Sequence, residues 1–249
     1  MALLDVHHYS TVLNMNMDMR VILPEKDTVT PEHPAKALYL LHGMGGDHTI
    51  WTRKTSIERY VEQYNVAVFM PETHLGWYTD MARGFRYFTY LTEELPVLIK
   101  RMFVSVSDKK EDTFVAGFSM GGYGAIKCAL KAEHLFSKAA ALSGAVDIAT
   151  RYDAQNMTYW EDIFGAQEKA SGSCNDLFRL AQEMPKDKRP PLYLWCGTDD
   201  FLYQDNVRFV KHLRALGYDV TWDDGPGGHT WDRWDEQIQP ALKWLLEEQ

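Results

Sequence analysis

The 249-residue chain has few cysteines, no excess of basic residues and no long hydrophobic run. Its three cysteines, Cys128, Cys174 and Cys196, lack CxxC spacing, which favours free thiols in a reducing cytoplasm over disulfides or structural zinc. With 26 basic and 35 acidic residues, the net charge of −9 disfavours partners such as nucleic acid or an anionic membrane. No run approaches the ~18 apolar residues of a membrane-spanning helix. The N-terminal residues lack a basic start and apolar stretch, so we expect no signal peptide.

The residues that are present give an ordinary globular composition. Hydrophobic residues make up 45% of the chain and charged residues 24%, which excludes disordered and fibrous proteins. No repeat, low-complexity tract or Ser/Gly/Pro-rich linker divides the chain. We therefore expect a single domain over residues 1–249.

Short β-rich runs alternate with amphipathic helical stretches. Strands are predicted at residues 12–23 (interrupted near Asn16), 37–42, 66–70, 113–118, 139–143, 192–196 and 219–222, and helices at 56–64, 91–103, 121–131, 206–216 and 234–246. Several strand runs are almost wholly apolar, as in parallel strands buried on both faces. The pattern predicts an α/β fold with a mostly parallel central sheet and helices on both faces. Within the first forty residues, two longer alternating runs predict an antiparallel hairpin at the sheet edge. Residues 147–176 do not follow the strand–helix alternation, and we expect them to form a small insertion over the active site.

Ser119 is the candidate nucleophile. It lies in the sequence GFSMG at residues 117–121, a GxSxG match between the apolar run TFVAGF and the helix-like run GGYGAIKCALKA. A nucleophile elbow needs this strand–turn–helix context, with small residues around a strained turn. The alternative is a glycine-rich turn that contains a serine by chance, and the context favours the catalytic interpretation.

A serine nucleophile needs a base, and in the α/β-hydrolase order the histidine follows it. Only His134, His212 and His229 follow Ser119. The first two belong to helical stretches, whereas His229 lies in a loop between the last predicted strand and helix. Because ligands meet open α/β sheets at such loops, His229 is the predicted base.

The acid is expected after the strand at residues 192–196, where Asp199 and Asp200 are adjacent. Either could accept a hydrogen bond from His229, and the other could cap the following helix.

An oxyanion hole needs two backbone donors. The N–H group of Met120 follows the nucleophile, and that of Met44, or less plausibly Gly43, lies in the glycine-rich loop after the strand at 37–42. A phosphate-binding loop would need GxGxxG spacing, which this loop does not have.

With these residues placed, the chain resembles the esterase D-like branch of the α/β-hydrolases, and within it the bacterial tributyrin esterase and cinnamoyl esterase group. The resemblance is carried by LLHGMGGD, WYTDMARGFRYFTYLTEELP, VAGFSMGGYGAIKCAL, YWEDIFG and WCGTDDFLYQDN. It implies an α/β-hydrolase fold, no cofactor or metal, small acyl esters as substrates and, in many members, a homo-oligomer. In the family pattern the acid directly precedes the Phe of GTDDFLY, which selects Asp200.

The resemblance also bears on the substrate pocket. S-formylglutathione hydrolases usually carry a cysteine in the loop where this chain has HGMGG, which speaks against that thioester activity. Related esterases place a small insertion beside the acyl pocket where this chain has an aromatic cluster, so Trp160, Tyr78 and Phe201 are predicted to contact substrate. The alternative for such a cluster is core packing.

We therefore predict a cytoplasmic serine carboxylesterase that hydrolyses short-chain acyl esters through an acyl-enzyme intermediate. The alternatives are a feruloyl/cinnamoyl or carbohydrate-acetyl esterase, then an S-formylglutathione hydrolase or an acyltransferase. A hydrolase-fold binding protein without catalysis belongs to a different class, and the three filled catalytic positions argue against it.

Overall fold

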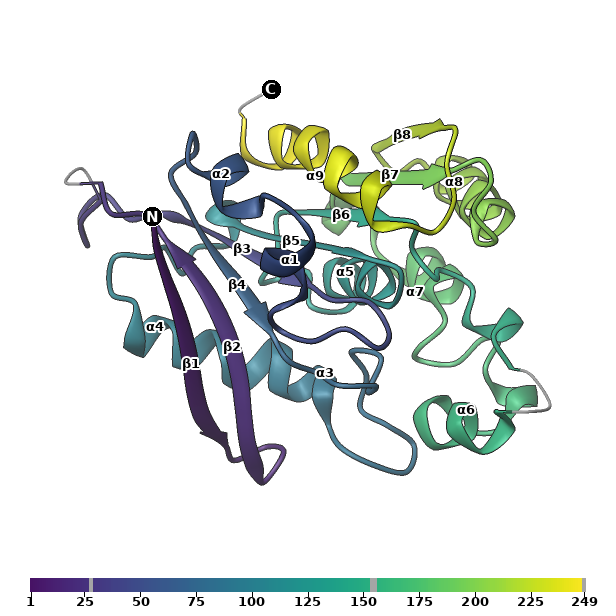
Figure 1. Ribbon diagram of the computed structural model, residues 1–249. Helices are drawn as coiled ribbons and strands as arrows, with labels where there is room; N and C mark the ends of the chain where they lie inside the picture. Colours follow the sequence, from purple (N-terminus) through teal and green to yellow (C-terminus); the bar gives the residue numbers. More distant parts are fainter. Residues whose placement is uncertain (27–28, 153–155, 248–249) are drawn as a thin grey trace.

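An eight-stranded sheet forms the centre of the computed structural model, which describes residues 1–26, 29–152 and 156–247 (Figure 1). The strand order is β1-β2-β4-β3-β5-β6-β7-β8. The strands are β1 (Ala2–Ser10), β2 (Met15–Leu23), β3 (Lys36–Leu41), β4 (Val66–Pro71), β5 (Thr113–Phe118), β6 (Lys138–Leu142), β7 (Leu192–Gly197) and β8 (Val220–Gly225). The β1–β2 and β2–β4 pairs are antiparallel and all later pairs are parallel. The predicted mostly parallel sheet with an antiparallel N-terminal edge is confirmed.

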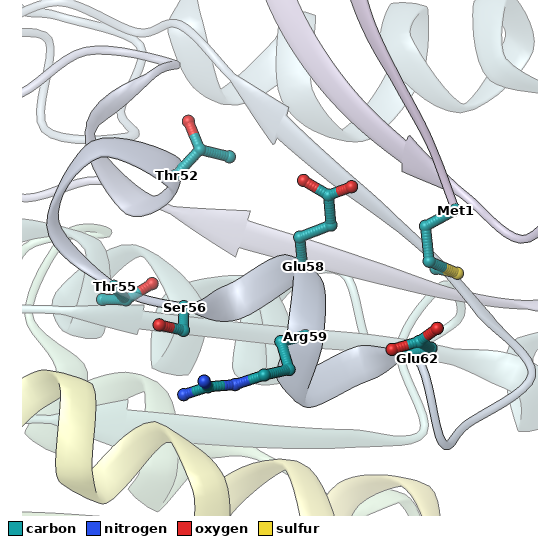
Figure 2. Close-up of a pocket in the computed structure, with 7 residues that line it drawn as sticks. All are labelled: Met1, Thr52, Thr55, Ser56, Glu58, Arg59 and Glu62. Atoms are coloured by element: carbon teal, nitrogen blue, oxygen red, sulfur yellow. The ribbon is translucent and has the colours of Figure 1, made fainter.

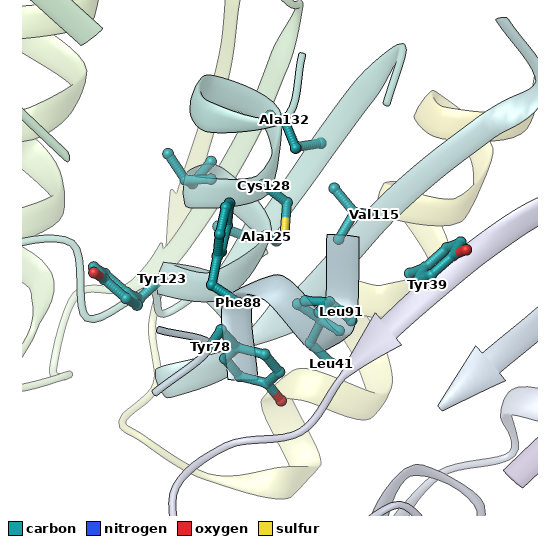
Figure 3. Packing of buried hydrophobic residues seen from close by; sticks show 14 of the residues in the cluster. Tyr39, Leu41, Tyr78, Phe88, Leu91, Val115, Tyr123, Ala125, Cys128 and Ala132 are labelled. Carbon is teal, nitrogen blue, oxygen red and sulfur yellow. The ribbon is translucent and has the colours of Figure 1, made fainter. Parts of the chain in front are cut away.

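Two helix layers cover the sheet and complete the predicted α/β-hydrolase architecture. The α-helices are α1 (Ile50–Lys54), α2 (Ile57–Val61), α3 (Tyr87–Thr89), α4 (Leu95–Met102), α5 (Met120–Lys131), α6 (Met157–Phe164), α7 (Leu177–Glu183), α8 (Tyr203–Leu216) and α9 (Trp231–Leu246). Helices α1, α2 and α9 bury their apolar residues on one face, and α4, α5, α7 and α8 on the other. Figure 3 shows the packing of the second face, where Tyr39 and Val115 of the sheet meet Cys128 of α5. None of the helices in the described part of the chain is both long and apolar enough to cross a bilayer.

Several predicted element boundaries were wrong: the helices predicted to begin at residues 206 and 234 begin three residues earlier, and the helix predicted over 56–64 spans 57–61. Two further differences have a clear local cause. Residues 12–14 were predicted as strand but form the turn of the β1–β2 hairpin, because Asn14 adopts a positive φ of 56°, which asparagine tolerates better than most residues. The helix predicted to begin at residue 91 begins at Tyr87, and a π-helical segment, η1 (Tyr90–Glu94), joins α3 to α4. Pro96 then lies in the first turn of α4, where its missing N–H group is tolerated.

The segment predicted as an insertion leaves the sheet after β6 and returns at α7, and its residues 153–155 lie outside the described residues. It holds α6 and the 3₁₀ turns η3 (Ile148–Thr150) and η4 (Gln167–Lys169), whereas η2 (Lys110–Asp112) and η5 (Lys186–Lys188) lie elsewhere. Helix α6 lies at one side of the molecule, near the loop that leads into α3 (Figure 1). The N–H groups of Ala82 and Arg83 donate to the carbonyls of Ile163 and Asp162 at 3.0 and 2.8 Å. The insertion is therefore docked on the loop between β4 and α3.

Candidate active site

Ser119 lies in a sharp turn between β5 and α5, with φ +54° and ψ −118°. Such a backbone is strained for a residue with a side chain, and here it exposes the hydroxyl at the carboxyl end of the sheet. A Cβ atom on Gly117 would lie 2.4 Å from the Gly121 carbonyl oxygen, and one on Gly121 would lie 2.4 Å from that of Leu41. The two glycines of GxSxG are required because α5 crosses β5 and β3 so closely.

His229 lies beside Ser119, in the loop between β8 and α9. Its Nε2 is 2.9 Å from Ser119 Oγ, and its Nδ1 is 2.8 Å from Asp200 Oδ2. The imidazole is held between the rings of Phe201 and Trp234, each with its centroid 4.7 Å away. The tertiary structure thus brings three residues that are 81 and 29 positions apart in the sequence into one hydrogen-bonded chain.

Asp200 is the buried end of this chain, with no exposed side-chain surface. Burial alone would raise the pKa of its carboxyl group. The hydrogen bonds from His229 and from the Leu202 N–H group, together with the charge of the imidazolium, outweigh burial and hold that pKa below its usual value. Asp200 is therefore a carboxylate in the position that the predicted acid of a triad requires.

The neighbouring Asp199 points away from His229. Its Oδ2 accepts from the Gly227 N–H group at 3.1 Å, and its own N–H group donates to the Gly227 carbonyl at 3.0 Å. The suggested capping role for Asp199 is wrong, because the cap of α8 is Leu202 and has no side-chain hydrogen bond. Asp199 instead fastens the loop that carries His229.

The two predicted oxyanion segments meet at the start of α5. Met120 is the buried first residue of that helix, and Met44 lies in the loop after β3. Gly121 packs against the carbonyl oxygens of Leu41 and His42, so the loop rests directly on the elbow. The two segments are therefore in contact, and the pairing of the Met44 and Met120 N–H groups in one oxyanion hole stays a prediction.

A cleft of about 410 Å³ opens next to this loop. It is lined by Met44, Gly45, Leu75, Asn156, Tyr159 and Trp160. Trp160 thus lines a cleft beside Met44, and its contact with substrate stays a prediction. Leu75, Asn156 and Tyr159 were not predicted, although Tyr159 directly precedes Trp160 in the YWEDIFG segment.

The other two predicted contacts lie in different environments. Tyr78 has no exposed surface, and its hydroxyl donates to the His42 carbonyl at 2.8 Å. The prediction that it contacts substrate is therefore corrected: it packs in the core beside Leu41 and Leu91 (Figure 3), and its hydroxyl holds the start of the loop after β3. Phe201 is 68% exposed and lies at the rim of the site, against His229.

A second cleft, of about 440 Å³, lies between the N-terminus and α2 (Figure 2). It is lined by Met1, Thr52, Thr55, Ser56, Glu58, Arg59 and Glu62. None of these residues is a histidine, so its hydroxyls have no imidazole base. Within the described ranges, no group of three or more His, Cys, Asp or Glu side chains could hold a metal ion.

Comparisons with known proteins agree with this geometry. Residues 10–245 match the family described as "Putative esterase". An acetyl esterase from Caldicellulosiruptor saccharolyticus is 33% identical, with 98% of each chain covered. Two solved structures from Staphylococcus aureus cover 99% of both chains with a TM-score of 0.88. They are the fluorophosphonate-binding serine hydrolase FphF, 35% identical, and the S-formylglutathione hydrolase FrmB, 34% identical.

The matches are to esterases in sequence and to serine hydrolases in structure, over nearly the whole chain. The finer resemblance to the tributyrin esterase group is not settled by them. The chain belongs to this esterase family and is a carboxylic ester hydrolase.

Proposed function

We propose that the protein hydrolyses short-chain acyl esters through an acyl-enzyme formed on Ser119. The observation that carries this proposal is the continuous hydrogen-bonded chain from Ser119 through His229 to the buried carboxylate of Asp200. His229 Nε2 takes the hydroxyl proton while Ser119 Oγ bonds to the ester carbonyl carbon. The tetrahedral intermediate collapses, the C–O bond to the alcohol breaks, and His229 returns the proton to the leaving oxygen. Water activated by the same imidazole then releases the acid.

The negative charge on the tetrahedral oxygen is assigned to the backbone N–H groups of Met44 and Met120. Each preorganised donor of this kind stabilises the transition state by roughly 3–4 kcal/mol in known sites. The contacts of Gly121 with the carbonyls of Leu41 and His42 support this assignment, because they hold the two donor segments together.

The cleft beside Met44 is proposed to hold the acyl group, with acetyl to butyryl chains preferred. Met44 and Leu75 give it apolar walls, and Tyr159 and Trp160 of α6 line it as well. The similarity to an acetyl esterase over 98% of both chains also favours short acyl chains.

Thioester hydrolysis is a second candidate, because a structure 34% identical over 99% of both chains is an S-formylglutathione hydrolase. The loop HGMGG lacks the cysteine usual in such enzymes, which favours oxygen esters. Comparing kcat/KM for S-formylglutathione and p-nitrophenyl acetate on the same preparation separates the two activities.

The proposal is tested by labelling with a fluorophosphonate probe and by hydrolysis of p-nitrophenyl acetate. Ser119→Ala is expected to abolish labelling and to lower kcat by at least about 10³-fold with folding intact, because only one hydroxyl is lost. Ser56→Ala, in the cleft of Figure 2, is the matched control and should keep both the labelling and the hydrolysis of the wild type. Labelling that survives Ser119→Ala, or activity above a tenth of wild type, would contradict the assignment.

A further inference from the structure

Glu72 is a buried carboxylate that the proposed chemistry does not use. It follows the last residue of β4, and its side chain is 8% exposed. Oε1 lies 3.2 Å from His42 Nε2 and accepts from the His74 N–H group at 2.6 Å. Oε2 accepts from the His48 N–H group at 3.0 Å and lies 3.3 Å from His48 Nδ1. One carboxylate thus contacts three histidines.

Two of those histidines, His42 and His48, lie at the two ends of the loop that is proposed to carry the Met44 oxyanion donor. The loop between His42 and His48 contains Gly43, Met44, Gly45 and Gly46, so its backbone has little stiffness of its own. Gly45 adopts a φ of +75°, and the Gly46 N–H group donates to the Gly43 carbonyl at 3.0 Å. A hydrolase needs this loop fixed, because an N–H group stabilises an oxyanion only if it already points at it.

The segment after Glu72 is strained, and it delivers further contacts to the same loop. His74, Trp77 and Tyr78 adopt positive φ values of 49°, 49° and 48°. Such conformations persist only where surrounding contacts hold them, and they gather at functional sites. Here the Tyr78 hydroxyl reaches the His42 carbonyl at 2.8 Å, and the Thr73 N–H group lies 3.2 Å from His42 Nε2.

The charge of Glu72 is secured by its surroundings. Burial alone would raise its pKa, but the nearby His42 ring and the N–H groups of His74 and His48 lower that pKa far below its usual value. The group therefore remains a carboxylate, with both oxygens engaged, throughout the pH range of an esterase assay.

From this geometry we propose that Glu72 is a positioning residue for the oxyanion hole. Its contacts with His42 and His48 hold the loop between them, and so fix the Met44 N–H group against the elbow at Ser119. The inference rests on the proposed function, because it presupposes that an oxyanion forms at this site. It assigns to Glu72 no contact with substrate.

The test uses Glu72→Gln, which keeps the size of the side chain but replaces one oxygen acceptor with an amide donor. The kcat for p-nitrophenyl acetate should fall by about 10- to 100-fold while KM changes less than about threefold, since the loss is confined to the transition state. The inhibition constant of a trifluoromethyl ketone, which forms a tetrahedral oxyanion on Ser119, should rise by a similar factor. If Glu72 only stabilised the fold, kcat and the inhibition constant of the ketone would not change by the same factor.

Glu94→Gln is the matched control. That carboxylate likewise holds a turn, accepting from the Thr11 N–H and hydroxyl groups at 2.6 and 2.7 Å, but it does so at the β1–β2 hairpin. This variant should lose stability and keep its kcat and inhibition constant. If Glu72→Gln does not fold, Tyr78→Phe removes only the hydroxyl from the His42 carbonyl, and the same coupled loss is expected at about three- to tenfold.

The proposal is overturned if the folded variant keeps kcat within threefold of wild type, or if kcat falls while the ketone binds as before. Fluorophosphonate labelling of the wild type at Ser119 distinguishes these results from a failure of the proposed function, which would remove labelling at Ser119 in the wild type itself.

Discussion

The two sides of the site are built differently. On the nucleophile side, the side chains of Ser119, His229 and Asp200 are aligned by two hydrogen bonds of 2.9 and 2.8 Å, and in the proposed mechanism they act through side-chain atoms. On the loop side, residues 42–48 are proposed to contribute a backbone N–H group. Glu72 and Tyr78, which do not contact the substrate in the proposed mechanism, hydrogen-bond to the two ends of this loop. Side-chain groups can be aligned by a few direct contacts, whereas backbone donors depend on buried residues that hold their loop in place.

Lys127 of α5 is a second buried ionisable group. It contacts the loop between β4 and α3, which also contains Tyr78. Its Nζ donates to the Thr79 hydroxyl and to Asn175 Oδ1, the latter at 2.8 Å, and lies 5.0 Å from the centre of the Phe88 ring. Burial, and then the charge of Lys131, lower the pKa of Lys127 to about 7. Glu72 keeps its charge because it faces donors and histidines, whereas Lys127 faces neutral oxygens and rings. Burial works against the charge of both groups, and only Glu72 has enough donors and charged neighbours to outweigh it.

The largest expected effect of a substitution on kcat is on the nucleophile side. Asp200→Asn should lower kcat by up to about 10⁴-fold with the fold intact, because an amide presents the wrong partner to His229. Asp199→Asn is the control and should change kcat by less than about tenfold, since it only weakens the contact with Gly227. Steady-state kinetics with p-nitrophenyl acetate measure both, and the reverse order of effects would make Asp199 the acid.

The next effect concerns Lys127 and stability. Between pH 7 and 10 the unfolded chain keeps the lysine proton and the native protein has lost it, so the free energy of unfolding rises with pH, by at most about 1.4 kcal/mol per unit. Below pH 7 both states hold the proton and this contribution is flat.

The variant Lys127→Met removes that contribution. The difference in unfolding free energy between wild type and variant should therefore shift by about 2–4 kcal/mol in favour of the wild type from pH 6.5 to 9.5. Urea denaturation at several pH values measures it. Parallel curves for the two proteins would mean that Lys127 titrates normally.

A smaller effect tests the cleft on the loop side. Trp160→Ala removes an indole from its lining, so the ratio of kcat/KM for octanoate over butyrate p-nitrophenyl esters should rise about tenfold. Trp244→Ala is the control, because that ring packs on Tyr193 beneath α9. An unchanged ratio would place the acyl group outside this cleft.

The smallest effect is expected at Phe201. Its ring is 68% exposed and packs on His229, so Phe201→Ala should lower kcat/KM by about two- to fivefold through a less restrained imidazole. A loss above 50-fold would instead assign substrate binding to this side chain.

Much of the fold and of the nucleophile side could be predicted. The apolar runs at β4, β5 and β7 identify strands buried on both faces, and the small residues at Gly117 and Gly121 reveal the close approach that the elbow needs. His229 followed from the order of residues along the chain. The choice of Asp200 over Asp199 needed a family resemblance, because two adjacent carboxylates are equivalent until a turn points them apart.

The loop side could not be predicted to the same extent. Tyr78 lies in an aromatic stretch that suggested a pocket, yet neighbouring chain segments cover it completely. Nothing local distinguishes Glu72 or Lys127 from solvated charges, because burial depends on what packs over them from distant parts of the sequence.

By itself, the sequence determined the alternation of strands and helices, the strained serine turn and the residue types of the catalytic chain. These follow from steric and hydrophobic rules that act over a few neighbouring residues. Packing between distant segments is what turns Asp200 and not Asp199 toward His229, buries Tyr78 in the core and places Glu72 against both His42 and His48. The physical reason is that each of these outcomes depends on a distance between segments far apart in the chain, and such distances exist only once the sheet and its helices have packed.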